Sequence, residues 1–149
     1  MPIAAAAAIA ASAFAVRAET CQGPVTSARL IVLIDGVRSA KGLMTASLYP
    51  GDRSQFLIKN GALKVWSVAA AAPQTRMCIW LKNGPGAYAV AVYHDANANG
   101  RWDHNPLTGI EGLGFSNNPR FGFSAPKYEA AKFQAQGALT TLHIRLRYP

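Results

Sequence analysis

Hydrophobic and polar residues alternate along much of this chain in short runs, as expected for β-strands that bury one face. In the clearest run, 141–148, every second residue is apolar: Leu142, Ile144, Leu146 and Tyr148. The residues between them are His143, Arg145 and Arg147. One buried face and one wet face are typical of an antiparallel sheet, so we predict that this run closes such a sheet.

Six further runs predict strands, and Gly, Pro or Asp residues punctuate the chain between them. They cover 28–36, 41–49, 62–70, 76–81, 86–95 and a shorter run at 130–136. No long amphipathic helix pattern is present. A chain of 149 residues fits one domain. About seven short strands in one domain predict an all-β, antiparallel β-sandwich.

The interval 96–127 interrupts the strand pattern and is rich in Gly, Asn and Pro. Loops of this length in compact domains are uncommon and are usually functional or disordered. This interval contains several large apolar residues, which disordered segments rarely carry. They are Trp102, Leu107, Ile110, Leu113, Phe115, Phe121 and Phe123. We therefore predict an ordered loop excursion that folds against the sandwich.

The N-terminal segment 1–18 resembles an export signal. An apolar run from Ile3 to Val16 precedes Val16-Arg17-Ala18, a small-residue cleavage pattern. The run is shorter than the roughly 20 apolar residues of a membrane-spanning helix. We expect a mature domain, 19–149, without a transmembrane segment, in the periplasm or outside the cell. The alternative is an alanine-rich helix that the mature protein retains.

The chain contains two cysteines, Cys21 and Cys78. In an oxidising compartment an even number of cysteines usually indicates disulfides, so export predicts a Cys21–Cys78 bridge. The bridge would connect the mature N-terminus to a strand in the middle of the chain and stabilise the fold by up to about 4 kcal/mol. The alternative is two unpaired thiols.

The charge balance bears on possible partners. Fifteen Lys and Arg residues against seven acids give a formal net charge of +8. Such a charge favours anionic surfaces. The basic residues are scattered, however, whereas nucleic-acid binding proteins more often cluster them with aromatic residues. We expect a cell-envelope polysaccharide or protein as the partner, and not a nucleic acid.

The stretch 94–106, HDANANGRWDHNP, carries the most concentrated candidate chemistry. Positions 1, 3, 5, 6 and 9 of the calcium-loop pattern D-x-[DN]-x-[DN]-G are occupied by Asp95, Asn97, Asn99, Gly100 and Asp103. The Arg101 carbonyl could supply the seventh-position oxygen. Pro106 stands at position 12, so Glu111 is the nearest further carboxylate. Few carboxylates predict weak Ca²⁺ affinity, about 10⁻⁴ to 10⁻³ M. The alternative is a metal-free turn stabilised by its own Asn and Asp side chains.

The histidines of this stretch allow a different interpretation. His94 and His104, with Asp95 and Asp103, could hold Zn²⁺ or a similar transition metal, which would suggest a small metal-dependent hydrolase. Alternatively, His94 is a hydrogen-bonded residue at the end of its strand.

Two further features of the excursion are candidates for binding. Trp102 lies within the polar stretch and either anchors it to the sandwich, which we favour, or contacts a partner. The run GFSNN supplies Phe115 and three polar residues that can cap backbone groups or act as neutral ligands. These are Ser116, Asn117 and Asn118.

The central motif and its surroundings resemble a known family. The segment YAVAVYHDANANGRWDHNPLTGIEGLGFSNNPRFGF, with YEAAKF and LHIRLRY after it, is similar to a bacterial family of exported proteins catalogued as domain of unknown function 2141. The resemblance implies an immunoglobulin- or transthyretin-like sandwich and implies no established activity. The family-pattern positions are His94, Asp95, Asn97, Asn99, Gly100, Asp103, Glu111, Gly112, Gly114, Phe115, Ser116, Asn117 and Asn118.

From these observations we expect an exported, non-enzymatic β-sandwich module. Its Ca²⁺-type loop would support recognition of an envelope component. Two alternatives stay open. The hydrolase requires an open metal position or an activated nucleophile in a pocket. A structural adaptor with a metal-free turn requires neither and would show an exposed apolar patch elsewhere.

Overall fold

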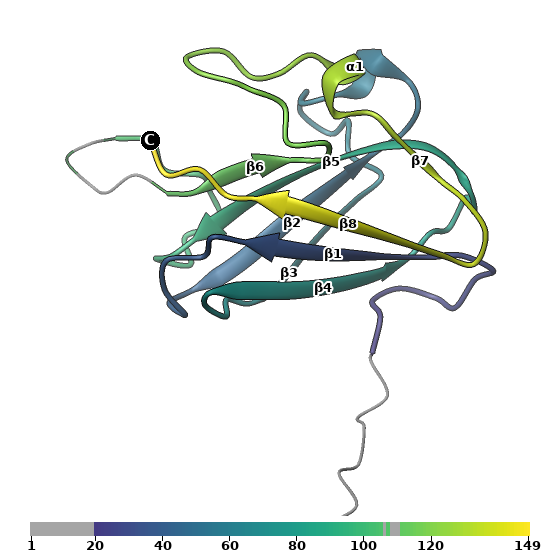
Figure 1. Ribbon diagram of the computed structural model, residues 1–149, viewed down its shortest axis with the longest axis horizontal. Helices are drawn as coiled ribbons and strands as arrows, with labels where there is room; N and C mark the ends of the chain where they lie inside the picture. Colours follow the sequence, from purple (N-terminus) through teal and green to yellow (C-terminus); the bar gives the residue numbers. More distant parts are fainter. Residues whose placement is uncertain (1–19, 106, 108–110) are drawn as a thin grey trace, which may run out of the picture.

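The computed structural model describes residues 20–105, 107 and 111–149, and these form two β-sheets that pack face to face (Figure 1). The predicted signal segment 1–18 lies outside the described residues. Within the described part of the chain no helix is long and apolar enough to cross a membrane.

Eight strands make up the two sheets in the described residues. One sheet has the order β4–β1–β8 (Gln74–Trp80, Arg29–Asp35, Leu139–Arg145). The other has the order β3–β2–β5–β6 (Lys64–Ala69, Leu43–Tyr49, Gly86–Asp95, Leu113–Phe115), and β7 (Phe133–Ala135) also pairs with β5. The helical elements are short: η1 (Arg53–Gln55) and α1 (Tyr128–Ala131). The all-β sandwich is therefore confirmed.

One strand pair differs from the predicted antiparallel pattern. β8 runs parallel to β1, with Leu139 opposite Arg29 and Arg145 opposite Asp35. The other pairs of named strands are antiparallel. The alternation in 141–148 was a correct sign of one buried face, because Ile144 and Leu146 are buried while Arg145 is exposed. Alternation reports burial and not strand direction, so it could not identify the parallel pairing.

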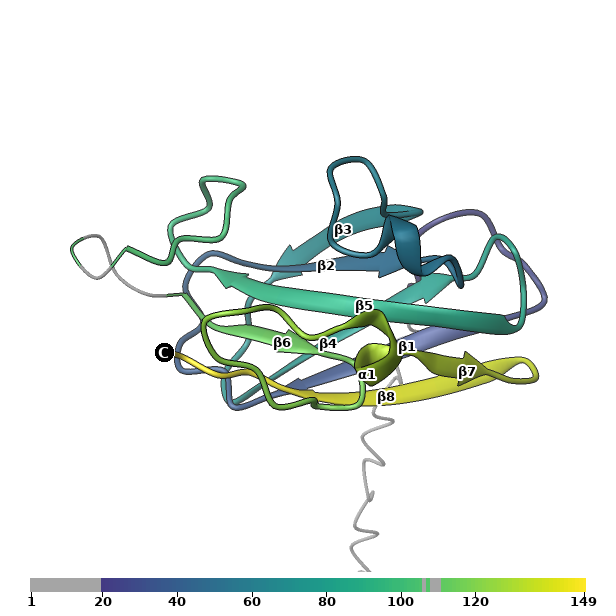
Figure 2. The same ribbon diagram turned by 90° about the horizontal axis from the view of Figure 1, so that it is seen from above.

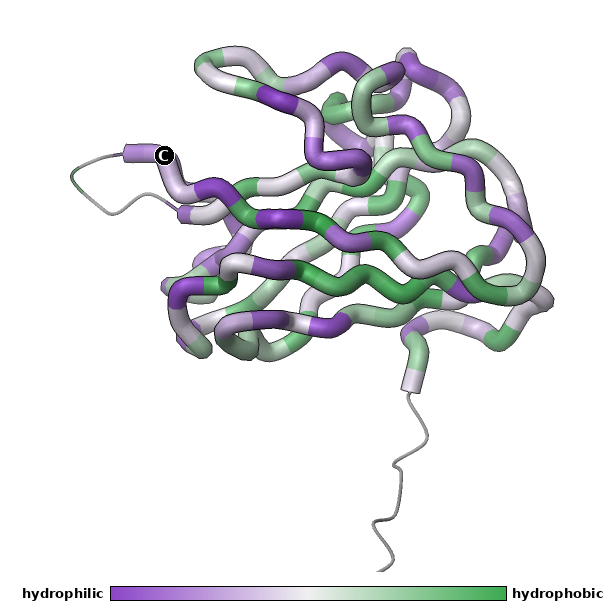
Figure 3. The backbone as a smooth tube through the Cα atoms, viewed as in Figure 1, coloured by the Kyte–Doolittle hydropathy of each residue, from purple (hydrophilic) through white to green (hydrophobic). Residues whose placement is uncertain are grey.

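The main core lies between the sheets and is formed by inward-facing residues of both, with the largest share from β1, β2 and β5. It includes Leu30, Val32, Ile34, Met44, Ala46, Leu48, Val90, Val92 and Ile144. Figure 2 shows the two layers in the perpendicular view. Figure 3 shows hydrophobic residues concentrated along the strands and hydrophilic residues in the connecting loops.

A second apolar cluster covers the outer face of β5. Ala89 and Phe115 pack there with Tyr49, Tyr128 and Ala131. β5 is therefore buried on both faces, and α1 and part of the excursion provide the outer cover.

The excursion 96–127 contains strand β6, which was not predicted from the sequence. Leu113 and Phe115 of β6 lie opposite Tyr93 and Ala91 of β5. Three residues are too few to show a strand period in the sequence, which explains why the strand was missed. The excursion does fold against the sandwich through Phe115, although Phe123 is fully exposed.

The predicted Cys21–Cys78 disulfide is present. Two backbone hydrogen bonds form next to the disulfide. The Gln22 N–H donates to the Cys78 carbonyl (3.1 Å), and the Trp80 N–H donates to the Gln22 carbonyl (3.0 Å). The N-terminal segment is thereby held along β4.

Candidate functional site

β5 ends at Asp95, where the chain enters a loop that we call the Asp/Asn loop, residues 95–103. Figure 2 shows this part of the chain projecting at the same end of the sandwich as the C-terminus. Asp95 is fully buried. Its Oδ1 accepts the Asn99 N–H (3.0 Å) and its Oδ2 accepts the Gly100 N–H (2.8 Å). One carboxylate therefore folds the following five residues back onto the end of the strand.

Glu111 is a second buried carboxylate, and it connects the two ends of the loop. Its Oε1 accepts the Ala96 N–H (2.9 Å) and its Oε2 accepts the Asp103 N–H (2.8 Å). The Glu111 N–H in turn donates to the Asp103 carbonyl (3.0 Å). Glu111, the nearest carboxylate after position 12 of the pattern, thus contacts the loop and binds backbone N–H groups there.

Asp103 is the third carboxylate, and two side-chain amides point at it. The Nδ2 groups of Asn97 and Asn99 donate to its Oδ2 at 2.8 and 2.7 Å. The hydrogen bond from Asn97 holds the pKa of Asp103 below its ordinary value of 3.8, and Asn99 and the positive charge of Arg101 act in the same direction. Asp103 is therefore ionised at neutral pH.

The amide oxygens of the loop are also engaged. Asn97 Oδ1 accepts the Asn99 N–H (3.2 Å), and Asn99 Oδ1 accepts the Arg101 N–H (2.9 Å). These are turns in which an Asn side chain replaces a backbone acceptor. In the described residues no three His, Cys, Asp or Glu side chains are grouped as metal ligands. The structure thus brings Asp95, Asn97, Asn99, Asp103 and Glu111 into one hydrogen-bond network.

His94 is buried and has a partner at each ring nitrogen. Nε2 lies 2.7 Å from the Lys41 carbonyl, and Nδ1 lies 2.9 Å from the Tyr148 hydroxyl. A carbonyl can only accept, so Nε2 carries the hydrogen; in the neutral ring Nδ1 then accepts from Tyr148. The Tyr148 oxygen also accepts the Arg38 N–H (3.2 Å). His94 therefore joins β5 to the segment before β2 and to the C-terminus.

Trp102, on the loop, and His104, directly after it, form a stacked pair with ring centroids 5.0 Å apart. The Trp102 indole N–H donates to the Glu111 carbonyl (3.0 Å). Trp102 thus anchors the loop, while His104 is exposed. His94 therefore contacts groups inside the fold, whereas His104 contacts the Trp102 ring.

The run Phe115–Asn118 lies apart from the hydrogen-bond network of the Asp/Asn loop and holds neighbouring elements together. Phe115 is buried in the second apolar cluster. The buried Ser116 hydroxyl accepts the Val90 N–H (2.9 Å) and donates to the Ala131 carbonyl.

The two asparagines of this run connect it to other elements. Asn117 donates to the Lys132 carbonyl next to α1. Asn118 donates to the His143 carbonyl (3.0 Å) and accepts the Arg145 N–H (2.8 Å), both on β8. Both asparagines have positive φ, 64° and 48°, a conformation that Asn adopts more readily than most residues.

Two participants were not predicted from the sequence. Tyr148 and the Lys41–Gly42 segment contact the end of β5 only because β2 pairs with β5, with Met44 opposite His94. Both are far from the motif along the chain, so no local signal marks them.

Comparison with known proteins gives one match. Residues 32–143 match the model of a family described as "Uncharacterized protein conserved in bacteria (DUF2141)". No curated protein and no solved structure shows significant similarity to the chain.

Proposed function

The chain belongs to the DUF2141 family, and we propose that it is a non-enzymatic binding module whose recognition surface is the region Asp95–Asn118. One observation supports this proposal: the carboxylates and the imidazole that could act in catalysis form hydrogen bonds that hold the loop and its surroundings in place. The carboxylates of Asp95 and Glu111 accept four backbone N–H groups, and both nitrogens of His94 have partners inside the fold. Such a site supports a rigid surface for binding.

The cell envelope is the location that we propose for this module. Disulfides persist mainly in oxidising compartments, and the Cys21–Cys78 bridge agrees with export. The net charge of +8 favours an anionic envelope polysaccharide or an acidic protein as the partner.

We further propose that Ca²⁺ binds weakly at the Asp/Asn loop. Asp95 and Glu111 are buried, and neither forms an ion pair within the described part of the chain. A carboxylate has about four lone-pair sites, so oxygen capacity is left at both groups. Asn97 and Asn99 donate to Asp103 where a cation needs acceptors, so binding requires their amides to rotate. This rearrangement favours low affinity.

The ion proposal is tested by thermal unfolding after chelation and then with Ca²⁺, Mg²⁺ or Zn²⁺ at about 10 mM. With a Kd of about 1 mM, Ca²⁺ stabilises the folded state by about 1.4 kcal/mol. For a chain of this size that raises Tm by about 3–6 °C. Asp103→Asn should abolish the rise, whereas Glu129→Gln, which removes an exposed carboxylate away from the loop, should retain it. No rise with Ca²⁺ would leave a metal-free loop, and a rise with Zn²⁺ alone would favour the hydrolase.

The recognition proposal has a separate test that does not depend on an ion. Purified peptidoglycan sacculi serve as the anionic polysaccharide, and bound protein is measured by sedimentation. Arg101→Ala combined with His104→Ala should reduce binding, because both side chains are exposed, one on the loop and one directly after it. Arg53→Ala combined with His143→Ala is the matched control. Equal binding by the two double variants would contradict a role for the loop.

The adaptor alternative is favoured by one specific observation. Four large apolar side chains near the β2–β3 connection are at least 38% exposed: Leu57, Ile58, Leu63 and Val65. Exposed apolar residues in one segment can form a protein contact surface. If the variants at residues 101 and 104 bind sacculi as well as the control variant does, this apolar segment becomes the candidate contact surface.

A further inference from the structure

A pocket of about 500 Å³ lies at the other end of the sandwich from the Asp/Asn loop. Tyr88, which lines it, is seven residues before Asp95 on β5, so the two sites are roughly 23 Å apart. The volume is within the range of about 300–1,000 Å³ that small-molecule sites occupy. The lining residues are Gly23, Pro24, Thr26, Leu48, Leu63, Lys64, Ile79, Trp80, Lys82, Asn83 and Tyr88.

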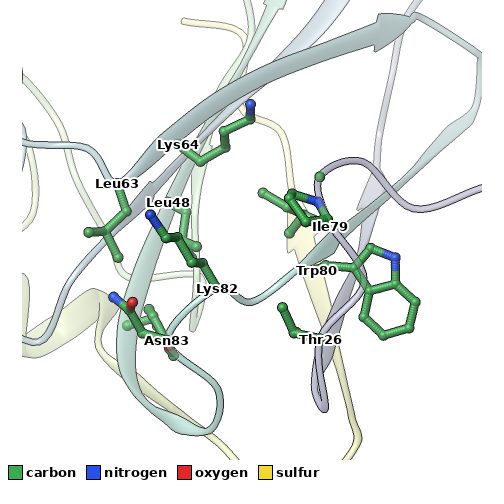
Figure 4. Close-up of a pocket in the computed structure, with 11 residues that line it drawn as sticks. Thr26, Leu48, Leu63, Lys64, Ile79, Trp80, Lys82 and Asn83 are labelled. Carbon is green, nitrogen blue, oxygen red and sulfur yellow. The ribbon is translucent and has the colours of Figure 1, made fainter.

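The wall of the pocket is mainly apolar. Leu48, Ile79 and Tyr88 are buried at its inner side, and Leu63 and Trp80 are partly exposed. Figure 4 shows Leu48 and Leu63 on one side of the pocket and Ile79 and Trp80 on the other. This arrangement suits a hydrocarbon chain that extends between the two sheets.

Two lysines give the mouth of the pocket a positive charge. Lys64 begins β3 and Lys82 follows β4, and both side chains are drawn in Figure 4. Both residues are exposed, and neither forms an ion pair in the part of the chain that the structure describes. None of the lining residues is acidic. The mouth therefore favours an anionic group.

The wall is held in place before any ligand binds. The Cys21–Cys78 disulfide fixes the segment that contributes Gly23 and Pro24. The Thr26 hydroxyl lies 2.9 Å from the Leu81 carbonyl, next to Lys82. The Tyr88 hydroxyl donates to the Gly84 carbonyl. A preformed wall reduces the entropy that a ligand loses on ordering the site.

We propose that this pocket binds an amphiphile with a single hydrocarbon chain and an anionic head group. The chain lies against Leu48, Ile79 and Trp80, and the head group lies at the mouth near Lys64 and Lys82. This site is separate from the Asp/Asn loop, so either proposal can fail without the other.

Calorimetric titration of the full chain with octanoate, decanoate and dodecanoate, each below its micelle concentration, tests the pocket. Each methylene buried strengthens binding about fourfold, so each step of two carbons should lower Kd about fifteenfold until the pocket is filled. Decyltrimethylammonium should bind more weakly than decanoate. Decyl phosphate, run in parallel, identifies which anionic head group is preferred.

Variants locate the site. Lys64→Gln combined with Lys82→Gln should weaken decanoate binding about tenfold. Lys127→Gln combined with Lys132→Gln removes the same charge near α1 and should have little effect. Leu63→Glu, at a side chain that is 46% exposed, places an anion at the mouth and should weaken binding at least as much. Circular dichroism verifies that each variant is folded.

The proposal would be overturned by the absence of saturable decanoate binding, by an affinity that does not depend on chain length, or by equal effects of the two double-lysine variants. Stronger binding of the cationic amphiphile would also overturn it.

Discussion

At the residue scale, the acidic and amide side chains of the Asp/Asn loop have different roles. Asp95 and Glu111 are buried and accept backbone N–H groups, so they determine the path of the chain. Asp103 receives the side-chain amides of Asn97 and Asn99 at a more exposed position. We therefore expect substitutions at the two buried carboxylates and at the partly exposed Asp103 to differ in effect.

Asp95→Ala should lower the free energy of unfolding by about 2–4 kcal/mol. The substitution removes two hydrogen bonds to a charged group and leaves the N–H groups of Asn99 and Gly100 without their acceptors. Asp103→Ala should lower the free energy of unfolding by clearly less, because the side-chain amides that donate to Asp103 can rotate and bind water instead. Urea unfolding followed by circular dichroism measures both, and equal losses would contradict the different roles.

The hydrogen bonds to Asp103 also predict its titration. NMR should find the pKa of the Asp103 carboxyl below the ordinary value of 3.8, and Asn97→Ala should raise it, because Asn97 contributes most to the shift. A folded-state pKa below the unfolded value means that ionised Asp103 stabilises the fold. That contribution is complete above the unfolded pKa and disappears as pH falls through the folded pKa. An unchanged pKa in Asn97→Ala would contradict the assignment.

At the element scale, the site depends on how closely β2 approaches the end of β5. Gly42, just before β2, has a φ of +68°, and a Cβ there would lie 2.1 Å from the Asp95 carbonyl oxygen. The residue before it, Lys41, provides the carbonyl that binds His94. The start of β2 and the end of β5 therefore meet with no space for a side chain.

Gly42→Ala should destabilise the fold by about 3–5 kcal/mol, since it combines an unfavourable backbone angle with a collision against backbone atoms. Gly84→Ala is the matched control: its φ is +69°, and a Cβ there would meet nothing within 4 Å. We expect Gly84→Ala to lower the free energy of unfolding by about 1–2 kcal/mol, because only the unfavourable backbone angle contributes. Chemical denaturation of both variants compares them, and similar losses would show that the close approach is unimportant.

At the scale of the whole molecule, the disulfide and the two apolar clusters connect distant parts of the chain. The Cys21–Cys78 bridge closes a loop of 57 residues and holds the N-terminal segment along β4. The second apolar cluster joins α1 and β6 to the outer face of β5. The bridge therefore acts beside the pocket, and the second cluster acts on the outer face of β5.

Replacing both cysteines with serine should lower the free energy of unfolding by about 2–4 kcal/mol, because the bridge restricts the unfolded chain over a long loop. The midpoint of urea unfolding measures the loss. Calcium dependence should be the same in this variant as in the original chain, since the bridge lies at the other end of the sandwich. A loss below about 0.5 kcal/mol would contradict a stabilising role for the bridge.

The residue pattern alone predicts the fold class and the position of most strands, and together with export it predicts the disulfide. Those features depend on local periodicity and on residue types that the chain displays directly: β5 was predicted with its observed bounds, and Trp102 was expected to anchor its loop. The parallel pairing of β8 with β1, the strand β6, and the contacts of His94 with Lys41 and Tyr148 become apparent only in three dimensions. The tertiary structure also brings Lys64 and Lys82 to one pocket. These features arise where segments far apart in the chain pack together, and alternation along a single strand contains no information about its neighbours.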